Sequence, residues 1–288
     1  SWGADELSLY GRFDFILAKD GTPKILEFNA DTPTSLLEAS VIQWQWKEDG
    51  FPECDQFNGI HEGLVQSWKD IFPKKGEIHF AGALENNEDT GTLQYLASTA
   101  MEAGFSTRVL DMQALDLQNG RFFDPAGELV NRCFKLYPWE WMVDESPDGC
   151  LAEMEWLEPI WKLVMSNKAI LATLYELFPD SPYVLPCYLS RPRSGLFCKK
   201  PVFSREGHNV SVVDIRDWEE YVRIAETEGD YNTGAYVYQE YVEPTAYSGR
   251  YPVIGSWIIG GEAAGIGIRE NRMEVTDNLS EFVPHIIG

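Results

Sequence analysis

The chain has 288 residues, of which 44% are hydrophobic, 13% aromatic and 24% charged. This length and composition predict about two domains, or one large two-lobed protein, and exclude disordered and fibrous chains. The 46 acidic and 23 basic residues leave a net charge of −23, which repels nucleic acids and anionic membrane surfaces and attracts cationic partners. We therefore expect that binding a polyanion would require a few well-placed basic residues and a divalent metal ion.

The cysteines and histidines predict neither a disulfide framework nor a zinc site. The five cysteines are widely spaced without a CxxC pair, which is typical of a reducing compartment, so we expect a cytoplasmic protein with inert thiols. The four histidines are dispersed. No stretch reaches the ~20 apolar residues of a spanning helix, and no export signal is visible. Because the sequence lacks an initiator methionine and soon becomes strand-like, we expect that an N-terminal portion is missing.

A β-hairpin is predicted for residues 10–18 and 24–29, because an Asp-Gly turn at residues 20 and 21 separates two alternating runs. The apolar side chains of both runs must share one face, since a one-residue slip would turn one set outward. That face holds Phe13, Phe15, Leu17, Leu26 and Phe28. A two-residue turn then places Asp14 opposite Glu27 and Arg12 opposite Asn29 on the other face.

The polar face of this hairpin predicts either a metal site or a solvated surface. Two facing carboxylates, Asp14 and Glu27, repel each other unless a cation lies between them. Together with the Asn29 amide they offer the oxygen ligands typical of Mg²⁺. The alternative is a face exposed to water. The loop at 30–35, which is rich in hydroxyl groups, favours the metal site.

The next segments predict helices followed by a β-α-β unit. In chain order they are helices at 36–46 and 59–71, a strand at 78–84, a helix at 91–103 and a strand at 107–110. The acidic break at 85–89 then lies at the carboxyl end of the first strand, where open α/β sheets bind ligands. Glu88 and Asp89 there could meet a cationic amine or form an ordinary solvated loop.

The second half of the chain predicts a helical region and then strands. The helical region covers 153–178, with interruptions near Pro159 and at 166–167. The strands are expected at 195–203, 209–214, 235–242, 251–259 and 263–269, with a helix near 217–228. The hairpin around Gly207 carries Lys199, Lys200 and Arg205, so its loop could cradle phosphate oxygens or be a simple hairpin. The glycines at 260–267 precede strand-like residues and are not a dinucleotide fingerprint.

Five separated blocks of sequence together resemble the synthetase domain of glutathionylspermidine synthases. The blocks are Arg12-Phe13-Asp14, residues 26–34, Asn167-Lys168-Ala169-Ile170-Leu171, Lys200-Pro201 with Arg205-Glu206-Gly207, and Gly267-Ile268-Arg269-Glu270. They occur in the order found in that family and span nearly the whole chain. Each block alone is weakly specific, whereas the combination is specific. We expect that the amidase domain of the bifunctional members is absent.

This resemblance implies roles for residues at the matching positions. Asp14, Glu27 and Asn29 match the family's magnesium ligands, and Arg12 matches an arginine that steadies the acyl group. Thr32 and Thr34 match positions near the carboxylate of the thiol peptide. The nucleotide contacts are expected at Lys168, Lys200, Gly207 in the cover loop 204–207, Gln239, Glu240 and Arg269. Ser204 departs from the family pattern, in which a glycine is common.

The resemblance also implies a fold and an activity. The fold is α+β, an ATP-grasp fold in circularly permuted order with a small Rossmann-like α/β lobe. We expect core elements at 1–75, the lobe at 76–150, a nucleotide-binding subdomain at 151–240 and a return to the core at 241–288. The implied activity is ATP- and Mg²⁺-dependent joining of a peptide carboxylate to a polyamine or similar amine through an acyl phosphate. The alternatives are a nucleotide or polyamine sensor and a phosphotransferase that stops at a phosphorylated product.

Overall fold

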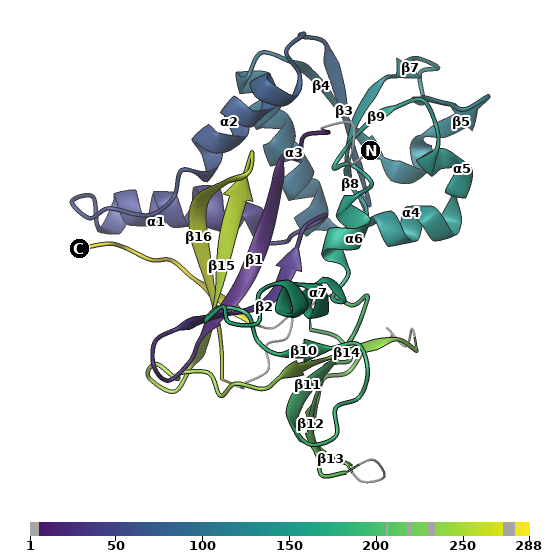
Figure 1. The fold of residues 1–288 in the computed structure, drawn as a ribbon. Helices are drawn as coiled ribbons and strands as arrows, with labels where there is room; N and C mark the ends of the chain where they lie inside the picture. The colour runs from purple at the N-terminus through teal and green to yellow at the C-terminus, as the bar shows by residue number, and fades with distance from the viewer. Residues whose placement is uncertain (1–5, 206, 218–220, 230–233, 273–279) are drawn as a thin grey trace.

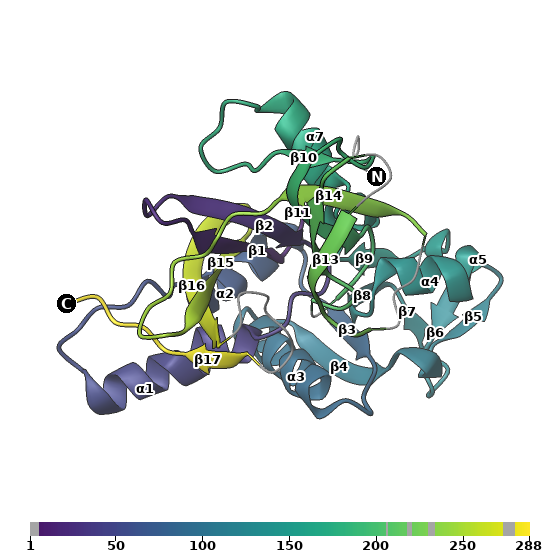
Figure 2. The ribbon, with the colours of Figure 1, turned by 90° about the horizontal axis from the view of Figure 1, so that it is seen from below.

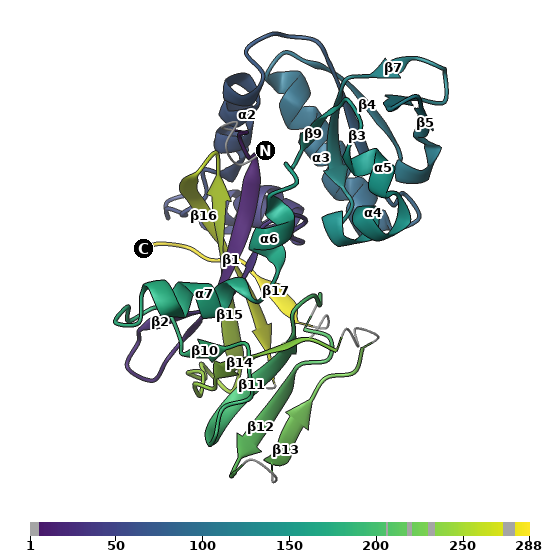
Figure 3. The same cartoon turned by 45° about the vertical axis from the view of Figure 1, so that its right-hand side comes forward.

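A computed structural model describes residues 6–205, 207–217, 221–229, 234–272 and 280–288. Three sheets of four or five strands are arranged with a five-stranded antiparallel sheet, here called the central sheet, between the other two (Figure 1; Figure 3). A parallel sheet lies beyond one end of the central sheet, and a second antiparallel sheet, here called the outer sheet, lies beyond the other. In the described part of the chain, no helix combines the length and apolarity needed to cross a membrane.

The central sheet has the strand order β17-β16-β15-β1-β2. Its strands are β1 (Tyr10–Leu17), β2 (Pro23–Asn29), β15 (Tyr251–Ile259), β16 (Glu262–Asn271) and β17 (Glu281–Val283). Helix α2 (Ile60–Ile71) packs on β15 and β16, preceded by a π-helical turn, η2 (Glu38–Ile42), and helix α1 (Gln43–Gly50). The fully buried rings of Trp68 and Trp257 belong to this core. The helices and strands expected in these regions are confirmed, with shifts of a few residues at their ends.

The β1–β2 hairpin has the expected register at its polar end, but for a different reason. Asp14 lies opposite Glu27, and Arg12 lies opposite Asn29. The turn contains three residues instead of two, since the Ala18 amide donates to the Thr22 carbonyl at 3.0 Å. A β-bulge after Asp14 shifts the pairing by one residue and so restores the expected register.

The bulge also changes the apolar face of the hairpin. Phe13 stacks on Phe28 as expected, with ring centroids 4.0 Å apart. Leu26 has no partner opposite it, because Phe15 pairs with Ile25. Leu26 lines the same cavity as Glu27, so the expectation that it completes the aromatic face was wrong.

The parallel sheet has the strand order β4-β3-β8-β9. Its elements are β3 (Glu77–Gly82), α3 (Asn87–Glu102), β4 (Ser106–Asp111), β8 (Arg132–Leu136) and β9 (Glu155–Leu157). The succession β3-α3-β4, with parallel pairing of the two strands, confirms the predicted β-α-β unit. The acidic break is shorter than expected. Asn86 caps α3 by accepting from the Glu88 amide, so Glu88 and Asp89 form the first helical turn.

Smaller elements complete this part of the chain. They are η3 (Met112–Ala114), β5 (Asp116–Gln118), β6 (Arg121–Phe123), β7 (Leu129–Val130), α4 (Trp139–Glu145), α5 (Pro147–Cys150), α6 (Lys162–Ser166) and α7 (Ile170–Leu177). The predicted helix at 153–178 was wrong at its start, because residues 155–157 pair with β8 as an edge strand. The interruption expected near Pro159 was wrong, because helix α6 begins only at Lys162, whereas the break expected at 166–167 is confirmed at residue 167, between α6 and α7. Strand β9 belongs to the parallel sheet but lies beyond residue 150, where the α/β lobe was expected to end. The division of the chain into domains stays a prediction.

The outer sheet has the strand order β10-β14-β11-β12-β13. Its strands are β10 (Cys187–Tyr188), β11 (Gly195–Pro201), β12 (Ser211–Ile215), β13 (Tyr221–Glu226) and β14 (Tyr236–Glu240). Helix α7 packs on β10 and β14 (Figure 2). The prediction of a helix near 217–228 was wrong for residues 221–226, because these residues form a strand that pairs with β12. Part of that expected helix, residues 218–220, lies outside the described residues.

A buried histidine gives the parallel sheet a pH-dependent stability. The His79 side chain is 2% exposed, and among the described residues neither ring nitrogen has a hydrogen-bond partner. Burial, assisted by Arg108, lowers its pKa, while Glu77 and Asp124, at 3.8 and 3.9 Å, act in the opposite direction. The unfolded chain therefore binds a proton to this histidine more readily than the folded chain does.

We expect the free energy of unfolding to fall as the pH decreases from 7.5 to 5.5, through the ordinary histidine pKa of 6.5. The loss from one such group is at most about 1.4 kcal/mol per pH unit. Urea denaturation of wild-type protein and of the His79→Leu variant at the two pH values measures it. A wild-type loss no larger than that of the variant would contradict this account of His79.

Candidate functional site

One cavity of about 530 Å³ brings together the residues that sequence reasoning selected. Its walls come from the central sheet, the start of α3, and strands β11 and β14 of the outer sheet. The lining includes all fourteen: Arg12, Asp14, Glu27, Asn29, Thr32, Thr34, Glu88, Asp89, Lys168, Lys200, Gly207, Gln239, Glu240 and Arg269. Residues from the two ends of the chain therefore meet at a single site.

Asp14 lies between two arginines on the floor of the cavity. Its oxygens accept from Arg12 Nε at 2.6 Å and Arg12 Nη2 at 2.9 Å, a bidentate pair between side chains that are at most 5% exposed. Arg269 Nη2 lies 2.7 Å from Asp14 Oδ2. Burial lowers the pKa of Arg269, and repulsion by Arg12 adds to the effect. For Arg12, burial acts to lower the pKa, but attraction to Asp14 outweighs it and raises the pKa.

Glu27, on β2 of the hairpin, is paired with Lys168, which lies between α6 and α7. Its Oε2 lies 3.1 Å from Lys168 Nζ, and its Oε1 accepts from Asn29 Nδ2 at 3.1 Å. Burial would raise the pKa of Glu27, but attraction to Lys168 and Lys200 lowers it to about 2. Glu27 is therefore ionised at neutral pH. The Asn29 amide also reaches Asp14 Oδ2 at 3.4 Å, so it connects the two carboxylates.

The donor set on this face fits a hard divalent cation. Asp14, Glu27 and Asn29 supply only oxygen ligands, and two carboxylates with water and phosphate oxygens are what Mg²⁺ usually takes. Among the described side chains, no group of three or more His, Cys, Asp and Glu residues could hold a metal ion. The expected repulsion between the facing carboxylates is offset by the protein's own cations, since Arg269 and Lys168 pair with them.

Lys200 and Gln239 connect the outer sheet to the hairpin. Lys200 Nζ donates to Gln239 Oε1 at 2.7 Å and to the Leu26 carbonyl at 3.1 Å. Gln239 Nε2 donates to the Ile25 carbonyl at 2.9 Å. Both side chains are buried, and their contacts fix β11 and β14 beside β2. The neighbouring lining is more apolar and includes Leu185, Cys198, Val210, Tyr241 and Val242.

The loop that was expected to cover a nucleotide lies against the cavity. Lys168 Nζ donates to the Ser204 carbonyl at 2.7 Å. Arg205 donates to Thr32 Oγ1 at 2.5 Å and to Glu140 Oε1 at 2.8 Å. Gly207 lies on the cavity wall with φ of 69°, a conformation that glycine adopts without strain. Glu206, the remaining residue of this loop, lies outside the described residues.

The structure adds residues that sequence reasoning missed. Glu38 and three residues at the start of the α4 region, Tyr137, Pro138 and Trp141, line the cavity. No helix was expected at 139–145, so the sequence offered no reason to select Tyr137, Pro138 and Trp141. Glu88 and Asp89 line the cavity from the first turn of α3. Thr34 contacts Arg12 through its backbone carbonyl at 2.5 Å, a contact that side-chain reasoning could not indicate.

Comparison with known proteins identifies the family. The model of the glutathionylspermidine synthase preATP-grasp family matches residues 1–288. The chain belongs to this family, as its sequence blocks predicted. A Haemophilus influenzae protein named as an acid–amine ligase is 39% identical over 300 residues, which cover 99% of this chain and 76% of that protein.

Two further relatives are longer proteins. The trypanothione synthetase of Crithidia fasciculata is 28% identical, over 98% of this chain and 48% of its own length. The bifunctional glutathionylspermidine synthetase/amidase of Escherichia coli is 26% identical, over 96% of this chain and 49% of its own length. The chain thus spans about half the length of these two relatives.

Solved structures support the fold. A protein of Methylobacillus flagellatus named as a γ-glutamylcysteine synthetase has a TM-score of 0.64 at 10% identity, over 99% of this chain and 82% of its own. A glutathione synthetase-like effector of Globodera pallida has a TM-score of 0.60 at 11% identity, over 98% and 77%. At this identity the likeness establishes the fold alone, a mixed α/β architecture consistent with the ATP-grasp type.

Proposed function

We propose that this protein is an ATP-dependent carbon–nitrogen ligase that joins a carboxylate to an amine through an acyl phosphate. The observation that carries the proposal is the convergence of two carboxylates and an amide with three separated cations, Lys168, Lys200 and Arg269, on one cavity. Although the chain has a net charge of −23, several basic side chains line this cavity, where a triphosphate would need them. The names of the relatives, all ligases or synthetases, support the same class of reaction.

The cavity divides into regions that suit the parts of ATP. Lys168, Lys200 and Arg269 would hold the phosphates, and Gly207 would lie over them. The more apolar lining near Leu185 and Cys198 suits a purine ring, beside Gln239 and Glu240. Asp14, Glu27 and Asn29 would hold Mg²⁺, which when bound neutralises charge on the phosphate oxygens.

Arg12 would orient the carboxylate and stabilise negative charge on it during attack. A carboxylate oxygen is a poor leaving group, so transfer of the γ-phosphoryl group to it provides a better one, and the amine then displaces phosphate. The Arg12 guanidinium is held by Asp14 and by the Thr34 carbonyl, so it is oriented before substrate binds. Preorganised donors of this kind stabilise developing charge at little reorganisation cost.

The substrates are proposed by class. Thr32 and Thr34 would face a peptide carboxylate such as that of glutathione, as the resemblance implies. Glu88 and Asp89, with Glu38 nearby on the cavity wall, would meet a cationic amine such as a polyamine. We further propose that the ATP-grasp core has a circularly permuted order with a Rossmann-like lobe, and that the protein acts in the cytoplasm.

Release of ADP tests the proposed function. We expect ADP to form from ATP and Mg²⁺ only when both an acid and an amine are present, beginning with glutathione and spermidine. Coupled-enzyme detection of ADP and mass measurement of the product give the two readouts. ATP binding with no ADP for any acid and amine pair would favour the sensor. A phosphorylated acid as the final product would favour the phosphotransferase.

A further inference from the structure

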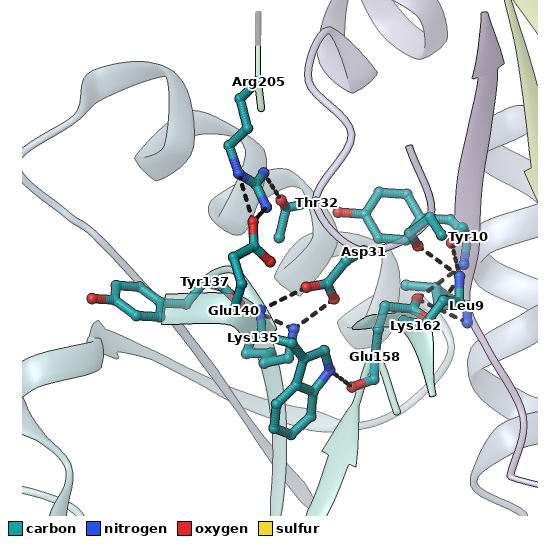
Figure 4. Close-up of polar contacts among 12 residues, drawn as sticks. Leu9, Tyr10, Asp31, Thr32, Lys135, Tyr137, Glu140, Glu158, Lys162 and Arg205 are labelled. Atoms are coloured by element: carbon teal, nitrogen blue, oxygen red, sulfur yellow. Dashed lines mark hydrogen bonds and ion pairs between the residues drawn. The ribbon is translucent and has the colours of Figure 1, made fainter. Parts of the chain in front are cut away.

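A buried ion pair lies behind the cavity wall, at residues that the proposed ligand contacts do not include. Lys135 Nζ lies 2.6 Å from Asp31 Oδ1, and both side chains are at most 1% exposed. Asp31 follows β2 of the central sheet, whereas Lys135 is on β8 of the parallel sheet. Figure 4 shows Asp31 pointing toward Lys135 from the neighbouring loop. The pair thus adds a charged contact between two sheets that also share an apolar core.

Each partner also fixes backbone at the start of helix α4. Asp31 Oδ2 accepts from the Trp139 amide at 2.9 Å, and Lys135 Nζ donates to the Tyr137 carbonyl at 3.0 Å. Helix α4 begins at Trp139, and its capping residue Pro138 offers no side-chain acceptor. Asp31 therefore accepts a hydrogen bond from the first turn of α4, where the residue that precedes the helix provides no side-chain cap. The Asp31–Lys135 pair thus holds loop 30–35 against the start of α4.

Residues close to the Asp31–Lys135 pair accept hydrogen bonds from two arginines that line the cavity. Thr32, adjacent to Asp31, and Glu140, adjacent to Trp139, both accept hydrogen bonds from Arg205 (Figure 4). Further along the same loop, the Thr34 carbonyl accepts from Arg12. A shift of the loop relative to α4 would therefore move the acceptors that orient both guanidinium groups.

A second buried pair already ties the loop to the rest of the fold. Lys162 Nζ lies 3.3 Å from Glu158 Oε2 and donates to the Tyr10 and Ala30 carbonyls, each at 2.7 Å. Glu158 Oε1 in turn accepts from the Tyr10 amide at 3.0 Å. Buried ion pairs are often no more stabilising than apolar side chains of similar volume. Stability alone therefore gives little reason for the additional Asp31–Lys135 pair.

We propose that Asp31 and Lys135 are positioning residues, whose ion pair sets the place of loop 30–35 against α4 and thereby orients Arg12 and Arg205 at the cavity. This inference rests on the proposed function, which assigns Arg12 to the reaction and places the loop that contains Arg205 beside the nucleotide. Neither partner lines the cavity, so neither is a catalytic residue.

The test is the double variant Asp31→Asn with Lys135→Met. It keeps side-chain volume, removes both charges and leaves an amide oxygen to accept from the Trp139 amide. Asp124→Asn is the matched control, because Asp124 is a buried carboxylate that pairs with Arg108 in the same part of the molecule, away from the cavity. Thermal unfolding, affinity for a non-hydrolysable ATP analogue, steady-state kinetics and hydrogen exchange are measured on all three proteins.

For the double variant we expect a melting temperature close to that of wild-type protein and an analogue affinity within twofold. We expect kcat to fall at least tenfold, KM for the acid to rise at least threefold, and amide exchange in residues 30–36 and 137–142 to accelerate at least tenfold. The control should match wild-type protein in kinetics and in exchange at these residues.

Two results would overturn the inference. One is unchanged kcat per folded molecule in the double variant, whatever its stability, which would assign the pair to folding alone. The other is unchanged exchange in both segments. Failure of wild-type protein to release ADP would instead overturn the proposed function, and the exchange experiment would still decide whether the pair holds the loop against α4.

Discussion

Replacing Arg12 with alanine should lower kcat at least a hundredfold while changing the affinity for an ATP analogue less than threefold. Loss of one preorganised donor to developing negative charge typically costs about 3 kcal/mol of transition-state stabilisation. The nucleotide contacts should persist because Lys168 and Lys200 are held by other groups, namely Glu27, the Ser204 carbonyl and Gln239. Steady-state kinetics and calorimetric binding measure the two effects separately.

A second variant is needed to separate loss of activity from loss of stability, because Arg12 forms a buried ion pair with Asp14. Removing one member of a buried ion pair can destabilise a protein by about 3–5 kcal/mol. Arg12→Lys keeps the charge but cannot reproduce the bidentate contact, so it should fold better and still lose most activity. Arg121→Lys is the control, because this arginine is 55% exposed and pairs with Glu153 away from the cavity. Equal losses of analogue affinity and kcat in the Arg12 variants would contradict the assigned role.

Replacing Glu27 with glutamine should affect the metal requirement as well as the rate. Glutamine retains an acceptor for Asn29 but removes the charge, which lies close to Lys168 and stays ionised because its pKa is about 2. We expect kcat to fall at least a hundredfold and the half-saturating Mg²⁺ concentration to rise at least tenfold. Initial rates over a range of Mg²⁺ concentrations measure both.

Glu243→Gln serves as the control for Glu27, because Glu243 is 56% exposed and pairs with Lys19 at the surface. Its kinetics should match those of wild-type protein. A Glu27→Gln variant with an unchanged Mg²⁺ requirement would remove Glu27 from the metal site, even if its kcat fell.

The sequence predicted the polar end of the hairpin well because alternation restricts the register so strongly. Only one parity of pairing brings Phe13 and Phe28 together on one face, and that parity places Asp14 opposite Glu27. Alternation does not determine the turn length, because a bulge after Asp14 compensates for the extra turn residue. The same bulge leaves Leu26 without a partner opposite it.

Other parts of the fold depend on contacts that a local pattern does not contain. Residues 221–226 form a strand because β12 offers them an edge, and the sequence there has no cue for that partner. Helix α4 is capped by Asp31, more than a hundred residues away, so its start could not be recognised locally. The resemblance to a family selected cavity residues from both ends of the chain, but it gave no indication of the Asp31–Lys135 pair or of the Glu140–Arg205 contact.

The most direct test of the central claim follows oxygen from the acid. Wild-type protein is incubated with Mg²⁺, ATP, an amine and an acid whose carboxylate carries ¹⁸O, and the amide, ADP and phosphate are quantified by mass spectrometry. We expect one ¹⁸O atom in the phosphate for each amide formed, because the carboxylate oxygen leaves with the phosphoryl group. Amide accompanied by unlabelled phosphate, or no amide with any acid and amine, would contradict the account.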